Sequence, residues 1–222
     1  MSGKLIWILL PVCGLLVWGA FRIDAPVREA VVASHGKDWK DSADNRFHSS
    51  VRVYGDWPPL MVGCLVALAL ARILKSRRWM RVIAAAMIAS TLAGLLGNVS
   101  RLTTGRTRPK ESPKIEQGFY GPWHDGKLLV GKPAYNSFPS GHTATAFGLA
   151  AVIVYTSPAV GIFALVGAGL VAWSSIVTGN HHPSDVTVSV ILSFFVAWIV
   201  WRWMSGPGGA WIEKLLRLPA DE

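Results

Sequence analysis

Three short polar stretches carry the residues of this sequence that could do chemistry, and each borders a long apolar run. The middle stretch reads Pro139-Ser140-Gly141-His142. Ser140 is well placed to cap the helix that follows, with its hydroxyl and the free backbone N–H of Gly141 facing outward. A helix N-terminus binds anions, and glycine allows a ligand close to the backbone. His142 would then lie beside a bound anion, although such a stretch taken alone is more often only a cap and an interfacial histidine.

The upstream stretch, residues 101–109, places Arg101, Arg106 and Arg108 at the exit of an apolar segment. Arginine is costly to bury there unless it meets an anion. The guanidinium fork matches two oxygens of a phosphate, so a phosphate is the natural partner. A basic cluster that faces lipid headgroups is the alternative reading.

The downstream stretch, residues 178–185, places His181 four residues before Asp185, a spacing that suits one face of a helical first turn. A carboxylate that accepts a hydrogen bond from one imidazole nitrogen fixes the tautomer and activates the other nitrogen as a nucleophile. His182 points elsewhere at this spacing and is expected to be structural. A solvated His-Asp pair is the alternative, but Asp185 is the only acid between Asp125 and Glu213 and begins an apolar run.

Composition predicts a membrane protein. Hydrophobic residues make up 51% of the 222 residues and charged residues only 16%, which is too apolar for an ordinary soluble domain. The net charge of +9 is concentrated in clusters between apolar runs, so nucleic acid is not an expected partner. Cys13 and Cys64 lie within apolar runs and indicate neither a disulfide nor a metal framework.

The apolar runs predict an all-α bundle of about six transmembrane helices, forming a single domain over residues 1–222. Residues 22–56 and 103–141 are expected to be extramembrane loops, with 26–35 suited either to a helix on the membrane surface or to a solvated loop. The first run also resembles a signal peptide, but the bulky Trp18 and Phe21 near the possible cleavage site favour a retained span. The expected spans are 5–21, 58–74, 82–100, 143–155, 159–178 and 186–204.

Charge distribution predicts the orientation of these spans. The short loop 75–81 is strongly basic and is therefore expected in the cytoplasm. Six spans then put both termini in the cytoplasm and the three polar stretches together on the opposite side. The compact chain suggests a bacterial inner membrane, with the site facing the periplasm. The basic loop 101–132 argues weakly for the reverse, but phosphate binding accounts for its arginines.

These stretches resemble the three motifs of the type 2 phosphatidic acid phosphatase superfamily of membrane lipid phosphatases. Residues 101–109 match the pattern KxxxxxxRP with Arg101 in place of lysine, and residues 139–142 match PSGH without change. Residues 174–185 match SRxxxxxHxxxD, except that Ser175 stands where the pattern has a phosphate-binding arginine. Motif order, spacing and the expected spans extend the resemblance over about residues 58–204.

The resemblance implies a metal-free mechanism that needs no cofactor. His181 would attack phosphorus to form a phosphohistidine, and Asp185 would orient its ring. His142 would protonate the leaving oxygen and then deprotonate the attacking water. The phosphate oxygens would be held by Arg101, Arg108, Ser140 and the N–H of Gly141.

The serine at position 175 removes one guanidinium, and we predict that Arg106 supplies part of the missing charge. The expected substrate is a lipid phosphate or diphosphate, presented at the bilayer surface. Phosphotransfer between lipids would use the same residues, and a degraded protein that only binds phospholipid is a further alternative. Specificity is expected in 22–56 and 110–138, and the sequence names neither the lipid nor an oligomeric state.

Overall fold

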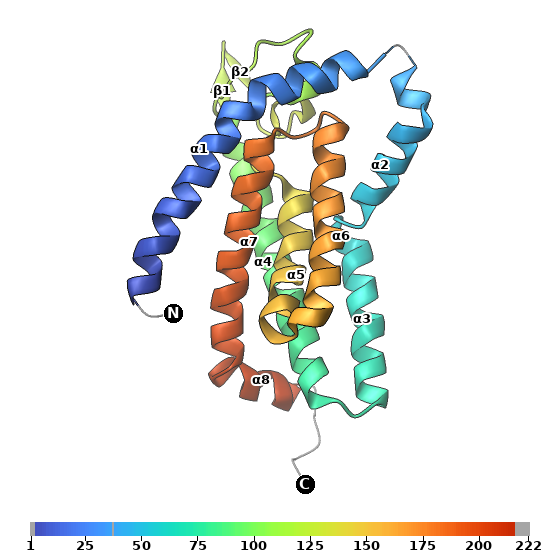
Figure 1. Ribbon diagram of the computed structural model, residues 1–222, viewed down its shortest axis with the longest axis vertical. Helices are drawn as coiled ribbons and strands as arrows, with labels where there is room; N and C mark the ends of the chain where they lie inside the picture. Colours follow the sequence, from blue (N-terminus) through green and yellow to red (C-terminus); the bar gives the residue numbers. More distant parts are fainter. Residues whose placement is uncertain (1–2, 37, 216–222) are drawn as a thin grey trace.

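Long apolar segments form a helical bundle with one small β-hairpin at its polar end (Figure 1). The computed structural model describes residues 3–36 and 38–215. This arrangement confirms the predicted all-α membrane class. The helices are α1 (Gly3–Ser34), α2 (Ala43–Val53), α3 (Trp57–Ile73), α4 (Arg77–Thr104), α5 (Gly141–Thr156), α6 (Pro158–Val177), α7 (Pro183–Met204) and α8 (Pro207–Leu215); the strands are β1 (Trp123–His124) and β2 (Lys127–Leu128).

Small residues let the central helices α4, α5 and α7 pack closely. Ala89 and Ala93 of α4 are fully buried, and a Cβ added to Gly148 of α5 would lie only 2.9 Å from the carbonyl oxygen of Ala89. Hydroxyls also bond between helices: Ser90 donates to the carbonyl of Thr145 at 2.8 Å, and Ser193 to that of Ala144 at 2.9 Å. Small side chains and interhelical hydrogen bonds are the usual means of packing helices in lipid.

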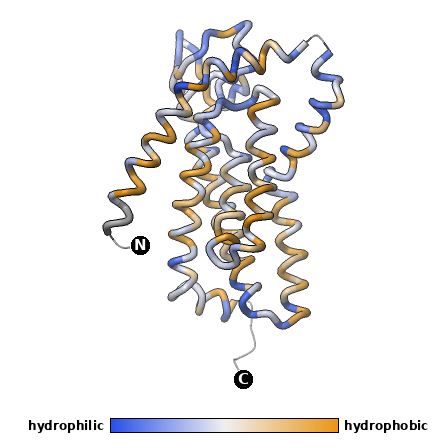
Figure 2. Tube along the Cα trace, in the orientation of Figure 1, coloured by the Kyte–Doolittle hydropathy of each residue, from blue (hydrophilic) through white to orange (hydrophobic). Residues whose placement is uncertain are grey.

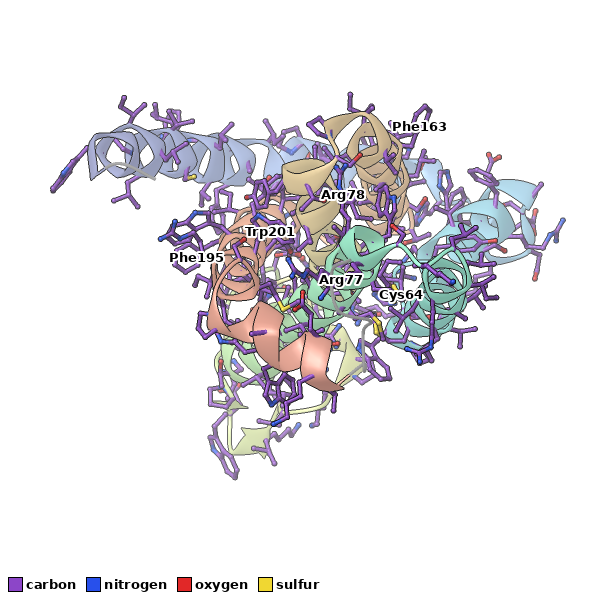
Figure 3. The ribbon with its side chains drawn as sticks, turned by 90° about the horizontal axis from the view of Figure 1, so that it is seen from below. Cys64, Arg77, Arg78, Phe163, Phe195 and Trp201 are labelled. Carbon is purple, nitrogen blue, oxygen red and sulfur yellow. The ribbon has the colours of Figure 1, made fainter. Side chains whose placement is uncertain are left out.

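Four of the described helices, α1, α4, α6 and α7, are long and apolar enough to cross a membrane. Helices α2 and α3 together make a fifth candidate, bent by 55°, and α5 is shorter at 16 residues. Apolar side chains cover the outer surface, as Phe163 of α6 and Phe195 of α7 show with exposures of 79% and 57% (Figure 3). The number of six spans stays a prediction.

The first helix is longer than predicted. The expected span 5–21 does not end there, because α1 continues as one helix through Ser34, with Pro26 inside it. Two tertiary contacts hold this extension: buried Asp24 pairs with Arg106, and His35 Nε2 donates to the carbonyl of Val177 at the end of α6. Figure 1 shows α1 rising beside α7 and then crossing the polar end of the bundle. The expected loop 22–56 is thus largely helical. Of the two alternatives for 26–35, a helix or a solvated loop, the structure shows a helix up to residue 34.

The second expected loop, 103–141, is also folded. It contains the hairpin β1–β2 and two short 3₁₀ turns, Pro109–Glu111 and Pro133–Tyr135. Gly105 ends α4 with a φ of 59°, and a Cβ there would lie 2.0 Å from the carbonyl oxygen of Gly121, so only glycine fits. Hydropathy colouring shows the apolar bundle below and the polar loop above it (Figure 2).

The basic cluster 72–81 lies at the other end of the bundle from the three polar stretches (Figure 3). Arg77 and Arg81 pair with Glu213 of α8, and Arg78 donates to the carbonyl of Thr156 at 2.8 Å. The cluster therefore also joins α4 to α8 and to the end of α5. The predicted cytoplasmic location of both chain ends concerns residues 1–2 and 216–222, which lie outside the described residues.

Candidate active site

The fold brings residues from all three polar stretches together at one end of the bundle. Arg108 Nη1 donates to the side-chain oxygen of Asn180 at 3.0 Å, which joins the first stretch to the third. The backbone N–H of Ser140 donates to the carbonyl of Asp185 at 3.4 Å, which joins the second to the third. These contacts place the N-termini of α5 and α7 side by side at the exit of α4.

The predicted nucleophile His181 is held by a backbone carbonyl. Its Nδ1–H donates to the carbonyl oxygen of Ser137 at 2.7 Å, whereas Nδ1 lies 3.7 Å from the nearer oxygen of Asp185. The expected direct His–Asp hydrogen bond is therefore replaced by an indirect link, because the Ser137 hydroxyl donates to Asp185 at 2.5 Å. With Nδ1 carrying the proton, Nε2 has a free lone pair, and this buried atom has no hydrogen-bond partner among the described residues.

Burial keeps His181 neutral. It lowers the pKa of the imidazole to about 4, and the charges of Arg108 and Arg52 act in the same direction. Asp185 raises the pKa but does not outweigh burial. A neutral imidazole at physiological pH is the protonation state that a nucleophile requires.

His142, in the first turn of α5, has a carboxylate partner that the sequence did not suggest. Its Nε2 lies 2.6 Å from Oδ1 of Asp56, the residue before α3. Gly55 packs directly against it, since an added Cβ would lie 2.9 Å from the Cβ of His142. The other nitrogen, Nδ1, is buried and has no hydrogen-bond partner among the described residues, so it is the atom free to move a proton.

Ser140 caps α5 as predicted, but its hydroxyl is completely buried and does not face outward. Its oxygen accepts hydrogen bonds from the backbone N–H of Thr143 at 3.4 Å and from the Thr143 hydroxyl at 2.9 Å. Gly141 lies against α4: an added Cβ would be 2.8 Å from the side-chain oxygen of Asn98 and 3.7 Å from Nη1 of Arg101. Glycine is thus what lets the start of α5 approach Arg101.

Arg101 and Arg108 bring two guanidinium groups to the histidines. Arg101 donates to Asn98 at 2.5 Å, and Nε of each arginine is buried without a hydrogen-bond partner among the described residues. Burial, together with the nearby charges of Arg101 and Arg52, lowers the pKa of Arg108 to about 10. Guanidinium groups this close repel one another, so an anion between them would be strongly bound.

Arg106 lies elsewhere, and this corrects the expectation that it replaces the missing arginine. The side chain is buried; Nη2 bonds Asp24 at 2.6 Å, and Nη1 bonds both Ser184 and Asp185. Two carboxylates therefore neutralise its charge, which leaves it suited to positioning Asp185 and not to holding phosphate. Its guanidinium also lies 4.6–5.7 Å from the rings of Phe21, Phe119 and Phe138.

The remaining residues of the third stretch are structural. His182 precedes α7, and its Nε2 donates to the carbonyl of Thr107 at 3.1 Å, as expected of a peripheral histidine. Ser175 is fully buried in α6, where its hydroxyl donates to the carbonyl of Val171. Among the residues that the structure describes, no three His, Cys, Asp or Glu side chains are grouped so that they could hold a metal ion.

Sequence reasoning missed Asp24, Arg52, Asp56, Ser137 and Asn180. Asp24 alone carried a usable signal, because an acid just beyond an apolar run is costly to bury without a partner. Arg52 and Asp56 lie in a segment without a motif, whereas Ser137 and Asn180 lie beside or within a motif at positions that the pattern leaves open. The roles of all four depend on how the segments pack around the site.

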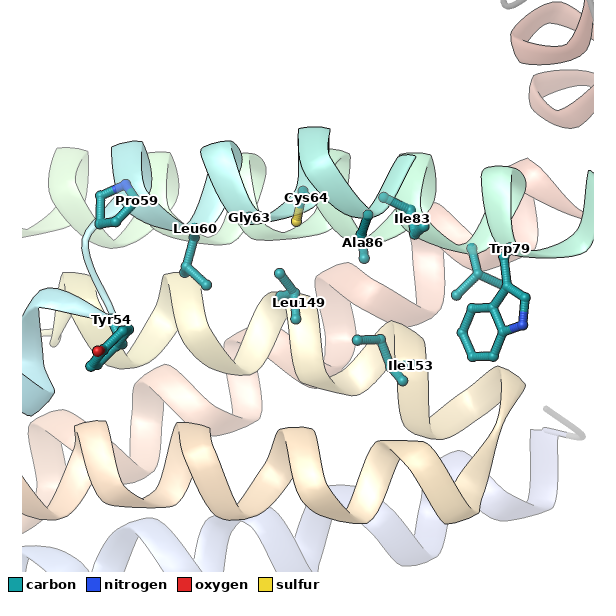
Figure 4. A pocket seen from close by; sticks show the side chains of 12 residues that line it. Tyr54, Pro59, Leu60, Gly63, Cys64, Trp79, Ile83, Ala86, Leu149 and Ile153 are labelled. Carbon is teal, nitrogen blue, oxygen red and sulfur yellow. The ribbon is translucent and has the colours of Figure 1, made fainter. Parts of the chain in front are cut away.

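An apolar pocket of about 420 Å³ lies between α3, α4 and α5 (Figure 4). Tyr54, next to Gly55 and Asp56, lines one end, and Trp79 lines the other. Its walls between these ends include Leu60, Cys64, Ile83 and Leu149. The pocket therefore runs from the neighbourhood of His142 along the membrane-embedded part of the bundle.

A helical bundle with apolar outer surfaces and a histidine–arginine cluster at one end defines a multi-pass membrane protein with a candidate site at that end. The chain belongs to the PAP2 superfamily, whose family model matches residues 79–207, more than half of the sequence. This match confirms the family that the three motifs indicated.

Two curated relatives match part of the chain. It is 30% identical over 114 residues to an undecaprenyl-diphosphatase of Sulfolobus acidocaldarius, a match covering 51% of this chain and 50% of that protein. It is 28% identical over 106 residues to a lipid A 1-phosphatase of Rhizobium johnstonii, covering 48% and 40%. The matched part thus spans half or less of the length of these relatives.

Solved structures share the fold. The PAP2-type phosphatidylglycerolphosphate phosphatase of Bacillus subtilis superposes with a TM-score of 0.59 at 19% identity, covering 90% of this chain and 95% of that one. Aquifex aeolicus LpxE superposes with a TM-score of 0.53 at 19% identity, covering 81% and 95%. At this identity the likeness establishes the architecture alone.

Proposed function

We propose that this protein is a membrane lipid phosphatase that hydrolyses a phosphomonoester or diphosphate through a phosphohistidine. One observation carries the proposal: two buried imidazole nitrogens, His181 Nε2 and His142 Nδ1, lack partners beside the guanidinium groups of Arg101 and Arg108. Both histidines are held through their other nitrogen, so these two atoms are preorganised for a ligand. Membership of the PAP2 superfamily and the names of the relatives support the same chemistry.

The reaction proceeds in two displacements. His181 Nε2 attacks phosphorus, and the bond from phosphorus to the leaving oxygen breaks. His142 enters this step as the imidazolium, paired with Asp56 through Nε2–H, and gives the leaving oxygen the proton on Nδ1. Water then attacks the phosphohistidine, His142 takes a proton from it, and inorganic phosphate leaves while His181 is regenerated. Arg101 and Arg108 stabilise the charge on the phosphoryl oxygens, and the buried start of α5 at Ser140 and Gly141 adds the positive end of a helix dipole.

A lipid is the substrate class that the surroundings favour. The phosphate site lies at the end of an apolar bundle, and the pocket between α3, α4 and α5 offers space for a hydrocarbon chain beside it. The relatives are named for a polyprenyl diphosphate and for lipid A, both lipids that carry phosphate. The orientation proposed from the basic loop 75–81 puts both termini in the cytoplasm and the site on the periplasmic face of a bacterial inner membrane.

Purified protein in detergent micelles, offered a panel of lipid phosphates and diphosphates, tests the proposal. We expect inorganic phosphate to be released from at least one lipid and His181→Ala to abolish release. His142→Ala should lower the rate by about 10²- to 10⁴-fold, the usual contribution of a general acid–base residue. EDTA should leave the wild-type rate unchanged. Product analysis with an added lipid alcohol separates hydrolysis from phosphotransfer, because only phosphotransfer makes a new lipid phosphate. A wild-type protein inactive on every lipid, or strong inhibition by EDTA, would contradict the proposal.

A further inference from the structure

The third motif normally has an arginine at position 175, and the anion site of this protein lacks it. Neither Ser175 in the third motif nor Arg106 in the first motif supplies the missing charge. Ser175 has no charge and is buried in α6. Arg106 is neutralised by Asp24 and Asp185. Any third guanidinium at this site must therefore come from a segment outside the motifs.

Helix α2 lies beside α6 and is attached to the site at two points. Near its middle, His48 Nδ1 hydrogen-bonds the hydroxyl of Ser174 at 2.9 Å, and Ser174 is the residue directly before Ser175. Just beyond its C-terminus, Asp56 lies 2.6 Å from His142, and Gly55 is packed against the same histidine. Both anchors are therefore in contact with residues of the second and third motifs.

Arg52 lies within α2, four residues after His48, and is followed closely by the second anchor at Gly55 and Asp56. Residues four apart share one face of a helix, so the Arg52 side chain extends from the face that α2 turns toward the site. Its Nε is buried and has no hydrogen-bond partner among the described residues. Its charge also reaches the site, because Arg52 contributes to lowering the pKa of both Arg108 and His181.

We propose that Arg52 is a phosphate-binding residue of this site, and that α2 delivers the guanidinium that position 175 lacks. Together with Arg101 and Arg108 it forms a cluster of three guanidinium groups around the two free imidazole nitrogens. Three such groups repel one another when the site is empty and each gains a charge-assisted hydrogen bond when a phosphoryl group binds. The inference rests on the proposed function for its substrate, but anion binding can be measured without turnover.

Orthovanadate is the probe, because it presents tetrahedral oxygens like those of phosphate. Its dissociation constant for purified protein can be measured from the rise in melting temperature, and its inhibition constant from phosphate release. We expect Arg52→Gln to weaken orthovanadate binding by about 10- to 100-fold, as expected for loss of a charged hydrogen bond. Arg52→Lys should lose less, because it keeps the charge but not the planar fork.

Arg46→Gln is the matched control. It lies on the same helix, is exposed, and donates to the carbonyl of Asp41, so its removal should leave binding unchanged. Gel filtration and the melting temperature without ligand identify variants that fail to fold, and Arg52→Lys then still tests the charge. Orthovanadate binding by Arg52→Gln within about twofold of wild type would overturn the inference. If wild type binds orthovanadate but hydrolyses no lipid, the proposed function fails while Arg52 is still tested.

Discussion

Asp24 of α1 and Arg106 form a buried ion pair that connects the first helix to the proposed active site. Asp24 Oδ2 lies 2.6 Å from Nη2 of Arg106, and the same guanidinium bonds Asp185 through Nη1. Asp24 also accepts hydrogen bonds from the backbone N–H and the hydroxyl of Ser184, at 3.0 and 2.6 Å. The position of Asp185 therefore depends on a helix that carries none of the three motifs.

Removing Asp24 should destabilise the fold. Asp24→Ala leaves Arg106 with one carboxylate in a buried site, and breaking a buried pair typically costs about 3–5 kcal/mol. We expect a lower melting temperature in detergent and reduced phosphate release. Glu29→Ala is the control, because Glu29 lies on the same helix with 73% of its side chain exposed. Equal melting temperatures for the two variants would show that the pair is not structural.

The contact between Asp56 and His142 should matter for catalysis. Asp56→Asn keeps the shape but removes the charge that orients the imidazole. We therefore expect kcat to fall by about 10- to 100-fold, less than the roughly 10²- to 10⁴-fold that a general acid–base residue itself contributes. His142→Ala should lose more. In the double variant, the loss should be close to that of His142→Ala alone, because Asp56 acts through the histidine. Losses that simply multiply would contradict this role, and steady-state kinetics on any accepted lipid decides between them.

The buried neutral state of His181 should make stability depend on pH. An unfolded histidine titrates near 6.5, whereas burial lowers the pKa of His181 in the folded protein to about 4. Between these pH values the unfolded state binds more protons than the folded state. His181 therefore contributes up to about 3 kcal/mol to the free energy of unfolding above pH 6.5, and this contribution is lost as the pH falls toward 4. As the pH is lowered from about 7 to about 4, the melting temperature of His181→Gln should fall less steeply than that of wild type. Identical slopes would contradict the prediction.

Filling the apolar pocket should discriminate against long lipids. Gly63 lines the pocket and has no atom within 4 Å of an added Cβ, so this position accepts a side chain and Gly63→Leu is the substitution to narrow the pocket. We expect the KM for a long-chain lipid phosphate to rise by about tenfold and the KM for a short-chain analogue to change little. The leucine would occupy space needed only by the far part of a long hydrocarbon chain. Gly167→Leu on α6, where an added Cβ also has open space, is the control. Equal effects on both substrates would argue against chain binding in this pocket.

Local pattern predicted much of the architecture. Runs of apolar residues indicated a helical membrane bundle, because that signal depends only on composition along the chain. The cap at Ser140 was also predictable, since a capping serine acts within four residues. The end of the first helix was not, because residues 22–34 contain charged residues and Pro26, which locally favour an end to the apolar span. These residues stay helical and are held by contacts with α6 and α7.

The sequence by itself determined the membrane class, the family motifs and the histidines and arginines that could do chemistry. Only the tertiary structure decided how the charges pair. Arg106 and Arg108 are two residues apart and equally basic, yet one is enclosed by Asp24 and Asp185 while the other lies beside His181. Arg52 and Asp56 belong to no motif and reach the site because α2 packs beside α6. Charge pairing depends on distances between residues far apart in sequence, such as Asp24 and Arg106, which are 82 positions apart. Such distances are properties of the packed helices and not of local sequence.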